Sequence, residues 1–492
     1  MALVHRVLYP SPLQSLAEYV RARGGSGLDA AQGLDPDAII DIVAASGLRG
    51  RGGAGFPTGR KWRTVRDNRS EVERTTVVVN AAEGEPGTFK DRTILRNDPY
   101  QVLEGALIAA RAVDADRVVV ATKQSFVVEI GRLRDAIAEM RAQGWCDGVD
   151  IDVFEGPKEY LYGEETALLE TVDGRFPFPR IAPPYRRGVT EVVESPADVE
   201  SGSGLPAHVE MASATHETEA PPTLVDNVET LANVARILAR GAEWFRTEGT
   251  PESPGTIVCT VTGSVRTHAV GEVVMGTPLR AVIDSVGGGA KPGRTIRAVL
   301  PGVSGALIPA TALDTPVSYE ALAAIGSGLG SGGFIVFDDA DDVVAVAAGV
   351  ARFLAVESCG QCTPCKLDGL RIAELLAAVG GSRAHAADLD ELRRRLTTVA
   401  DGARCSLATQ QQVVATSVLD QFPGDVEAHV EGRAPAAEPV LVAELLDIAG
   451  GVAHADEHHR AKQPDWTFNE TDSGQFPAAR LGEHRTPEHL DE

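Results

Sequence analysis

The stretch TTVVVNAAEGEPGTFKDR, residues 75–92, starts as an apolar, β-branched run and continues into glycines and charged residues. Two further runs of the same kind follow, RVVVAT at 117–122 and VDIDVF at 149–154, with helical sequence between them. This alternation predicts an α/β fold, a mostly parallel sheet with helices packed on it. Open sheets of this class bind ligands where the chain leaves the carboxyl ends of the strands, so the residues from Asn80 onward are candidate site residues.

Composition and pattern divide the chain into five segments. They are an N-terminal helical segment (1–46), an α/β domain (47–250, with an acidic insertion loop at 190–222), a β-rich domain (255–340), a helical domain (344–425) and an acidic extended tail (430–492). Within the α/β domain, a helix is expected from residue 226, with Asp226 as its N-cap.

Charge and hydropathy exclude several classes of function. The 492 residues include 46 basic and 70 acidic side chains, a net charge of −24, which argues against nucleic-acid binding. The sequence contains no apolar run of about 18 residues, so no transmembrane helix is expected. The amino terminus lacks the layout of a secretory signal. A cytoplasmic protein is expected, either free or on the cytoplasmic side of a membrane complex.

Four of the six cysteines form one pattern. Cys359, Cys362 and Cys365 stand in ESCGQCTPCK, and Cys405 follows forty residues later. A C-x2-C-x2-C triplet with one remote cysteine is a spacing that holds a [4Fe–4S] cluster. A structural zinc site usually has two separated pairs of ligands, and the short spacings leave little room for unstrained disulfides. The pattern therefore predicts an electron carrier.

A glycine-rich loop, GLRGRGGAGFPTGRKW at residues 47–62, predicts an anion site. Glycine permits positive φ and brings backbone amides close to a ligand, and Arg49, Arg51, Arg60 and Lys61 add positive charge. Gly50 to Gly55 spell G-x-G-x-x-G, but they follow a predicted helix at residues 35–45 rather than a strand, and no P-loop lysine is present. A phosphate or pyrophosphate is the expected ligand.

Two groups of acidic residues are further candidates. Asn80, Glu83 and Glu85 offer hydrogen-bonding groups for ribose hydroxyls or a flavin edge. Glu164 and Glu165, in YLYGEETALLE, stand at the start of a predicted helix, where the alternative role is to stabilise the helix dipole.

Taken in order, GLRGRGGAGFPTGRKW, NAAEGEPGTFKDR, YGEETAL, DNVETL and ESCGQCTPC closely resemble the NADH-binding flavoprotein subunit of respiratory complex I. The same family includes the diaphorase subunits of NAD-dependent formate dehydrogenases and NAD-reducing hydrogenases. The resemblance spans residues 47–422. It implies a Rossmann-like FMN domain, a ubiquitin-like β-grasp domain and a C-terminal helical bundle that carries a [4Fe–4S] cluster.

The resemblance also implies cofactors, roles and partners. Hydride would pass between NAD(H) and FMN, and single electrons would pass to or from the cluster. Glu164 and Glu165 would tune charge and binding rather than carry the hydride step. The partners implied are a separate thioredoxin-like [2Fe–2S] subunit and a larger iron–sulfur or catalytic subunit. The residues implied for FMN are Gly50, Gly52, Gly53, Gly55, Lys61, Asn80, Glu83 and Asn227, and those for NADH are Phe56, Glu85 and Tyr185.

Several positions depart from the family pattern. Ala82 stands where an acid that hydrogen-bonds the flavin side chain is usual, and Ala182 replaces a lysine. The other departures are Thr64, Tyr162, Tyr185 and Asp226. Two hypotheses remain: a diverged but working NAD(H) diaphorase, or an electron-transfer paralogue that retains FMN and the cluster but serves another carrier.

Overall fold

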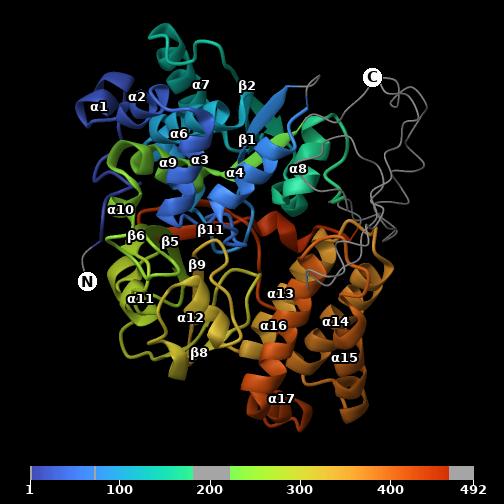
Figure 1. Ribbon diagram of the computed structural model, residues 1–492. Helices are drawn as coiled ribbons and strands as arrows, with labels where there is room; N and C mark the ends of the chain where they lie inside the picture. Colours follow the sequence, from blue (N-terminus) through green and yellow to red (C-terminus); the bar gives the residue numbers. More distant parts are fainter. Residues whose placement is uncertain (1–2, 71–73, 181–221, 465–492) are drawn as a thin grey trace, which may run out of the picture.

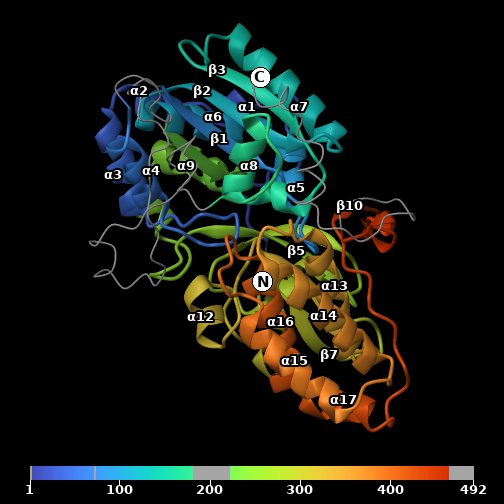
Figure 2. The same ribbon diagram turned by 90° about the vertical axis from the view of Figure 1, so that its right-hand side faces the viewer.

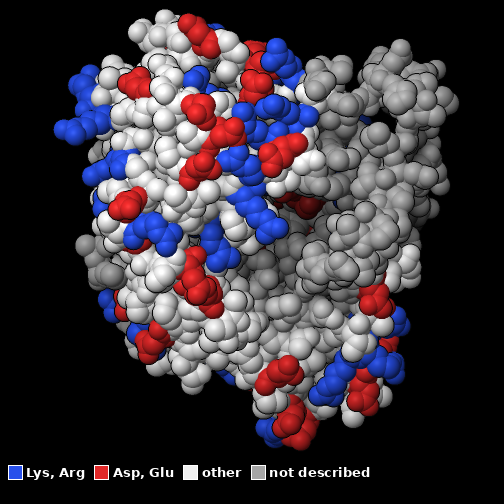
Figure 3. Space-filling view, viewed as in Figure 1, with Lys and Arg blue, Asp and Glu red and all other residues white. Residues whose placement is uncertain are grey.

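The computed structural model describes residues 3–70, 74–180 and 222–464 (Figure 1). An α/β lobe occupies one end of the molecule, and a β-rich unit and a group of helices lie side by side at the other end (Figures 1 and 2). Tyr185, Ala182 and most of the expected insertion loop lie outside the described residues. On the face shown in Figure 3, acidic and basic side chains are interspersed.

Short helices precede and follow the glycine-rich loop. They are α1 (Leu16–Arg21), α2 (Ser26–Gln32), α3 (Pro36–Ser46) and α4 (Thr58–Asp67). The Asp35 carboxylate caps α3 by accepting a hydrogen bond from the Ala38 amide at 2.9 Å. Gly47, at φ 71°, ends the helix. The loop therefore follows a helix, as the sequence indicated.

The α/β lobe is built on a parallel sheet in the order β3-β2-β1-β4. Its strands are β1 (Thr75–Ala81), β2 (Ala115–Lys123), β3 (Asp150–Gly156) and β4 (Thr223–Asn227). The three predicted strands are present, and β4 was missed. Its pairing with β1, in which Val78 lies opposite Val225, stabilises a run too short to recognise from the sequence.

The helix expected from residue 226 begins later, so the prediction of Asp226 as its N-cap is wrong. Helix α9 is Val228–Arg240, and the cap is Asn227, whose side-chain oxygen accepts a hydrogen bond from the Glu229 amide at 3.0 Å. Asp226 belongs to β4 because the strand pairs with β1 up to Asn227.

The remaining helices of this lobe cover the sheet or close its carboxyl end. They are α5 (Lys90–Asn97), α6 (Pro99–Val113), α7 (Val127–Ala142), the 3₁₀ helix η1 (Tyr160–Gly163), α8 (Glu165–Val172) and α10 (Ala242–Phe245). Helix α6 packs against α9 and is buried along nearly its whole length, as expected for a helix apolar on most faces.

The β-rich unit contains a five-stranded mixed sheet in the order β6-β5-β9-β7-β8. Its elements are β5 (Thr256–Gly263), β6 (Ala269–Val274), α11 (Leu279–Gly287), β7 (Ile296–Leu300), β8 (Ile308–Pro309), η2 (Ala310–Ala312), α12 (Tyr319–Ala324) and β9 (Gly333–Asp338). Strands β5 and β9 are parallel and the other neighbours are antiparallel.

Five helices follow and carry the cysteines. They are α13 (Val343–Glu357), α14 (Thr363–Gly380), α15 (Ala386–Thr398), α16 (Leu407–Gln421) and α17 (Pro423–Val430). The cysteine triplet spans the turn between α13 and the start of α14, and Cys405 lies just before α16. Within the described residues, no helix is long and apolar enough to cross a membrane.

The prediction of an extended tail after residue 430 is wrong for residues 445–460. The chain runs from α17 back to the junction of the two lobes (Figure 2). There it forms a hairpin of β10 (Leu445–Ala449) and β11 (Val452–Ala455), followed by η3 (Glu457–Arg460). Gly450 and Gly451, at φ 58° and 79°, make the two-residue turn of this hairpin. The Gly-Gly pair is a hairpin signal, but the polar composition of the surrounding segment led to the prediction of an extended tail.

Candidate functional site

A cavity of about 710 Å³ opens at the carboxyl ends of β1 and β4. Its walls come from the glycine-rich loop, the chain after β1, the start of α8, a loop of the β-rich unit and the chain beside Cys405. The described residues that the sequence singled out for flavin and nucleotide all line it: Gly50, Gly52, Gly53, Gly55, Phe56, Lys61, Asn80, Glu83, Glu85, Glu164, Glu165 and Asn227. The volume suits an organic cofactor.

The glycines of this loop allow its backbone to turn sharply and to pack closely against neighbouring side chains. Gly53 and Gly55 have φ of 133° and 63°, a region that other residues rarely adopt. A Cβ on Gly55 would lie 2.5 Å from the Tyr319 ring, and one on Gly52 would lie 3.2 Å from Asn227. The loop fits a phosphate-bearing group held by backbone amides.

The four cations of this loop have different roles. The buried Arg51 guanidinium donates to the carbonyls of Pro254 and Thr256, each at 3.0 Å, and so fastens the loop to the β-rich unit. Arg51 and Arg60 are not among the cavity-lining residues, whereas Arg49 and Lys61 are. Of the four cations that add positive charge to the loop, two therefore lie at the cavity.

Lys61 is the ammonium group inside the cavity. Its Nζ lies 2.5 Å from Oε1 of Glu165 and donates to the Val225 carbonyl at 2.6 Å. Asp226 lies beside it and accepts a hydrogen bond from the Trp62 indole at 2.6 Å. Burial raises the pKa of Asp226 to about 6, although Lys61 opposes that shift.

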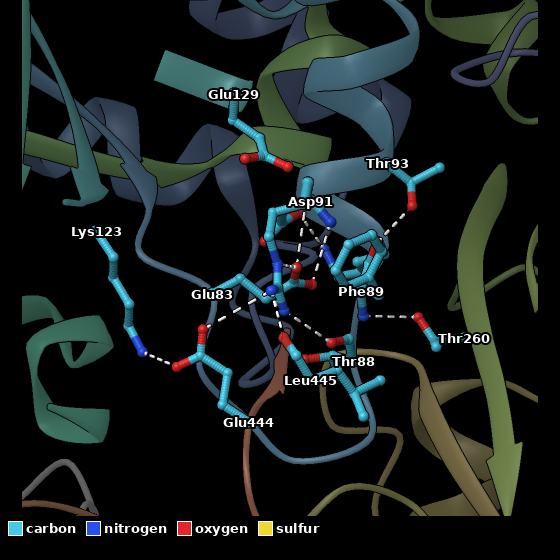
Figure 4. A network of polar contacts seen from close by, with 12 residues as sticks. Glu83, Thr88, Phe89, Asp91, Thr93, Lys123, Glu129, Thr260, Glu444 and Leu445 are labelled. Atoms are coloured by element: carbon cyan, nitrogen blue, oxygen red, sulfur yellow. Dashed lines mark hydrogen bonds and ion pairs between the residues drawn. The ribbon is translucent and has the colours of Figure 1, made fainter. Parts of the chain in front are cut away.

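Asn80 and Glu83 use their polar groups on the protein itself. The Asn80 side chain donates to the Gly163 carbonyl at 2.9 Å. The Glu83 carboxylate accepts from the Asp91 amide at 3.1 Å and from the Arg92 guanidinium at 3.0 Å. The Glu83 contacts belong to the network in Figure 4. Together with the Asn80 hydrogen bond they hold the cavity wall in shape.

Behind this wall is a buried charged group that the sequence analysis did not single out. Lys90 Nζ lies 2.7 Å from Asp91 and 3.0 Å from Glu229, and the Asn227 amide donates to Asp91 at 2.7 Å. Asp91 also lines the cavity. The letters FKDR after the strand were the available signal, but only the fold shows that Lys90 is buried.

Glu85 and Glu164 are also bound to backbone. Glu85 accepts hydrogen bonds from the Val303 amide at 3.2 Å and from the Ser331 hydroxyl, so the β-rich unit completes the cavity. Glu164 caps α8 by accepting from the amides of Thr166 and Ala167. Burial raises the pKa of both glutamates.

The four cysteines of the predicted iron–sulfur site surround a second, smaller cavity. They are thiols without disulfides, and burial raises the pKa of Cys365 to about 11. In the described part of the chain, no three His, Cys, Asp or Glu side chains gather closely enough for a single ion. A cubane cluster needs a wider arrangement because each thiolate binds a different iron atom, so the cysteine set fits it.

The two cavities adjoin. Cys405, Leu161 and Leu407 line both of them. A flavin-sized site and a four-cysteine site therefore share a wall, which is the arrangement required to pass electrons between two cofactors.

Comparison with known proteins agrees with this geometry. The family model described as the Nuo51 FMN-binding domain matches residues 43–236, and the NADH-ubiquinone oxidoreductase-F iron-sulfur binding region matches 345–429. The NADH-quinone oxidoreductase F 2 subunit of Rhizobium meliloti (strain 1021) is 35% identical over 430 residues, 85% of this chain and 95% of the relative.

This chain belongs to the NADH-quinone oxidoreductase-F family. Another relative in this comparison is the NADP-reducing hydrogenase subunit HndC of Solidesulfovibrio fructosivorans, 36% identical over 85% of this chain and 81% of the relative. Among solved structures, the chain is similar to NAD⁺-reducing [NiFe]-hydrogenase in the H₂-reduced state. The TM-score is 0.69 at 32% identity, covering 85% of this chain and 67% of that one.

Proposed function

We propose that this member of the oxidoreductase-F family is the diaphorase subunit of a multi-subunit oxidoreductase. It exchanges hydride between NAD(H) and FMN and passes single electrons to or from a [4Fe–4S] cluster. The observation that supports this most directly is the wall shared by the glycine-lined cavity and the four-cysteine site. When bound, FMN takes up an electron pair as hydride and releases electrons singly.

The protein's own residues bind and orient in this proposal. The amides of Gly50, Gly52, Gly53 and Gly55, with the ammonium of Lys61, would hold the FMN phosphate. Asn80, Glu83 and Asn227 would shape the flavin pocket, Glu83 by keeping the wall in place through Arg92. Glu164 and Glu165 would adjust the charge of the pocket, and Cys359, Cys362, Cys365 and Cys405 would bind the cluster.

The nicotinamide nucleotide would enter beside Phe56 and Glu85. Phe56 is 46% exposed at the cavity, an unusual position for a large apolar ring and a suitable one for stacking on a ligand. The half-buried Glu85 side chain is positioned by the β-rich unit. Tyr185, outside the described residues, is proposed as the aromatic partner of the adenine.

Four structural and biological assignments belong to the same proposal. We assign a β-grasp domain to residues 255–340, supported by the strand order, and a cluster-bearing helical bundle to 344–425. A thioredoxin-like [2Fe–2S] subunit and a larger iron–sulfur or catalytic subunit would be the partners. The complex would work in the cytoplasm or on the cytoplasmic side of a membrane.

Anaerobic titration tests the proposed function. The full-length protein, reconstituted with FMN and cluster, should lose its visible flavin absorbance when NADH or NADPH is added, and NAD⁺ serves as the control without hydride. If dithionite bleaches the flavin but neither reduced nucleotide does, the diaphorase assignment is wrong and the electron-transfer paralogue is favoured.

A further inference from the structure

The side-chain amide of Asn227 lies at the cavity, and protein groups hold both of its ends. Its Oδ1 accepts hydrogen bonds from the Glu229 amide at 3.0 Å and from Nζ of Lys90 at 3.2 Å. Its Nδ2 donates to Oδ2 of Asp91 at 2.7 Å. Both Asn227 and Asp91 line the cavity. The amide therefore has a cation at its oxygen and an anion at its nitrogen.

The charges around this amide select one of its two orientations. Nζ of the buried Lys90 lies 2.7 Å from Oδ1 of Asp91 and 3.0 Å from Oε2 of Glu229. Burial would lower the pKa of Lys90, but Asp91 and Glu229 raise it further, so the ammonium is charged. Turning the amide over would place its NH₂ group against two donors and its oxygen against the Asp91 carboxylate. Such contacts are costly where water is excluded.

Asp91 is itself held in place, and it leaves one donor of the amide unused. It lies in the first turn of α5, its side chain is 7% exposed, and its backbone amide donates to Oε1 of Glu83 at 3.1 Å (Figure 4). A carboxamide has two N–H donors, and Asp91 accepts one of them. Among the described residues, no acceptor takes the second N–H. Because Asn227 lines the cavity, that N–H is available to a ligand there.

We propose that Asp91 is a positioning residue that holds the Asn227 carboxamide so that its second N–H donates to an acceptor oxygen of FMN. The inference rests on the proposed function, in which FMN occupies this cavity. The phosphate, the ribityl chain and the isoalloxazine ring all offer oxygens of this kind. A donor that is already held in its bound orientation strengthens binding, because less freedom is lost when the ligand arrives.

A double-mutant cycle tests the proposal on the full-length protein, freed of flavin and titrated with FMN at a pH well above the pKa of Asp91. Asp91→Asn keeps the shape of the side chain but offers either a donor or an acceptor, so it no longer selects one amide orientation. Asn227→Ser removes the carboxamide and keeps a hydroxyl that can cap α9.

The quantity compared is the factor by which Asp91→Asn raises the dissociation constant for FMN. This factor should be roughly threefold to tenfold larger in the wild-type background than in the Asn227→Ser background, the size of one hydrogen bond. Removal of the carboxylate charge acts on FMN in both backgrounds and cancels from the comparison.

Riboflavin and the absorption spectrum identify the acceptor. A difference between the backgrounds with FMN but not with riboflavin indicates the phosphate. A difference with both ligands indicates the ribityl chain or the ring, and a shift of the visible flavin band in Asp91→Asn then indicates the ring. Each of these results supports the proposal.

A buried carboxylate away from the cavity provides a matched control. Glu104 accepts hydrogen bonds from the Tyr19 hydroxyl and from the amides of Gly25 and Leu28, and it is not among the cavity-lining residues. Glu104→Gln should lower the urea midpoint of unfolding and leave the dissociation constant for FMN unchanged. Loss of stability alone would thereby be separated from loss of positioning.

Equal effects of Asp91→Asn in the two backgrounds, including no effect in either, would overturn the proposal. If this variant does not fold, Asp91→Ser replaces it in the cycle, because its shorter side chain ends before the carboxylate position. Failure of both variants to fold would also overturn the proposal and indicate a purely structural role. A wild-type protein that binds neither FMN nor riboflavin would instead refute the proposed function, and the first titration shows this before any variant is compared.

Discussion

At the residue scale, Asp226 gives the cavity proposed for FMN an unusual charge balance. Lys61, the cation available to a phosphate, already contacts Glu165 at 2.5 Å and has the Asp226 carboxylate nearby. Burial raises the pKa of Asp226 to about 6, so the group is neutral below that pH and ionised above it. An ionised Asp226 opposes an anionic ligand.

We expect Asp226→Asn to bind FMN more tightly than the wild type above pH 7, by roughly threefold to tenfold for one removed charge near Lys61. The advantage should vanish below about pH 5, where the wild-type carboxyl is protonated. Fluorescence titration of each apoprotein with FMN measures the dissociation constants of the wild type and of the variant. Protonation of the FMN phosphate affects both constants equally, so it does not change their ratio. A ratio that does not change with pH would contradict this interpretation.

Cys405 is the one proposed cluster ligand among the residues that line both cavities. We expect Cys405→Ser to lose the iron–sulfur absorbance and EPR signal while FMN binding stays within a few-fold of the wild type. The pocket proposed for FMN is otherwise built from the glycine-rich loop and the strand ends. Simultaneous loss of both cofactors would show that the two sites do not form independently.

At the scale of the element, the glycine-rich loop depends on its backbone shape and on arginines that hold it in place. Gly55 combines a positive φ with a close approach to Tyr319, whose hydroxyl donates to the Gly50 carbonyl at 2.7 Å. Arg51, which the sequence analysis counted among the positive charges of the predicted anion site, anchors the loop to the β-rich unit.

Gly55→Ala should therefore weaken FMN binding at least tenfold and destabilise the protein by about 1–3 kcal/mol through backbone strain and the Tyr319 contact. Gly131→Ala is the matched control, because it lies in α7 with open space around its Cβ position. That control should be neutral or stabilising by up to about 1 kcal/mol. Urea unfolding and FMN titration of both variants provide the measurements.

At the scale of the whole molecule, long-range ion pairs join the carboxy-terminal segment, residues 440–464, to the α/β lobe. Glu444 faces Lys123, which is fully buried, and lies near Arg92, which in turn holds Glu83 at the cavity (Figure 4). The cavity wall thus depends on residues that follow it by more than three hundred positions.

Glu444→Gln should destabilise the protein by about 2–4 kcal/mol, because it leaves the buried Lys123 ammonium without its carboxylate. Glu431→Gln removes an exposed partner of Arg433 and should change stability by less than about 0.5 kcal/mol. Denaturant unfolding compares the two variants. Equal stabilities would show that the carboxy-terminal segment does not support the α/β lobe.

Local patterns were sufficient for much of this protein. The strands at 75–81, 115–123 and 150–156, the helix before the glycine loop and the cysteine spacing are recognisable because each depends on near neighbours in the chain. The sequence motifs also led to the cavity residues, since strand ends and turn glycines carry their own signals.

Tertiary contacts decided the rest. Strand β4 forms because β1 pairs with it, and that pairing moves the helix cap from Asp226 to Asn227. Arg51 and Glu83 are occupied by backbone and by Arg92, partners that no local pattern reveals. The polar segment after residue 430 packs against both lobes because buried charges elsewhere, Lys123 and Glu357, need counter-ions from it. Only the folded chain brings those charges together.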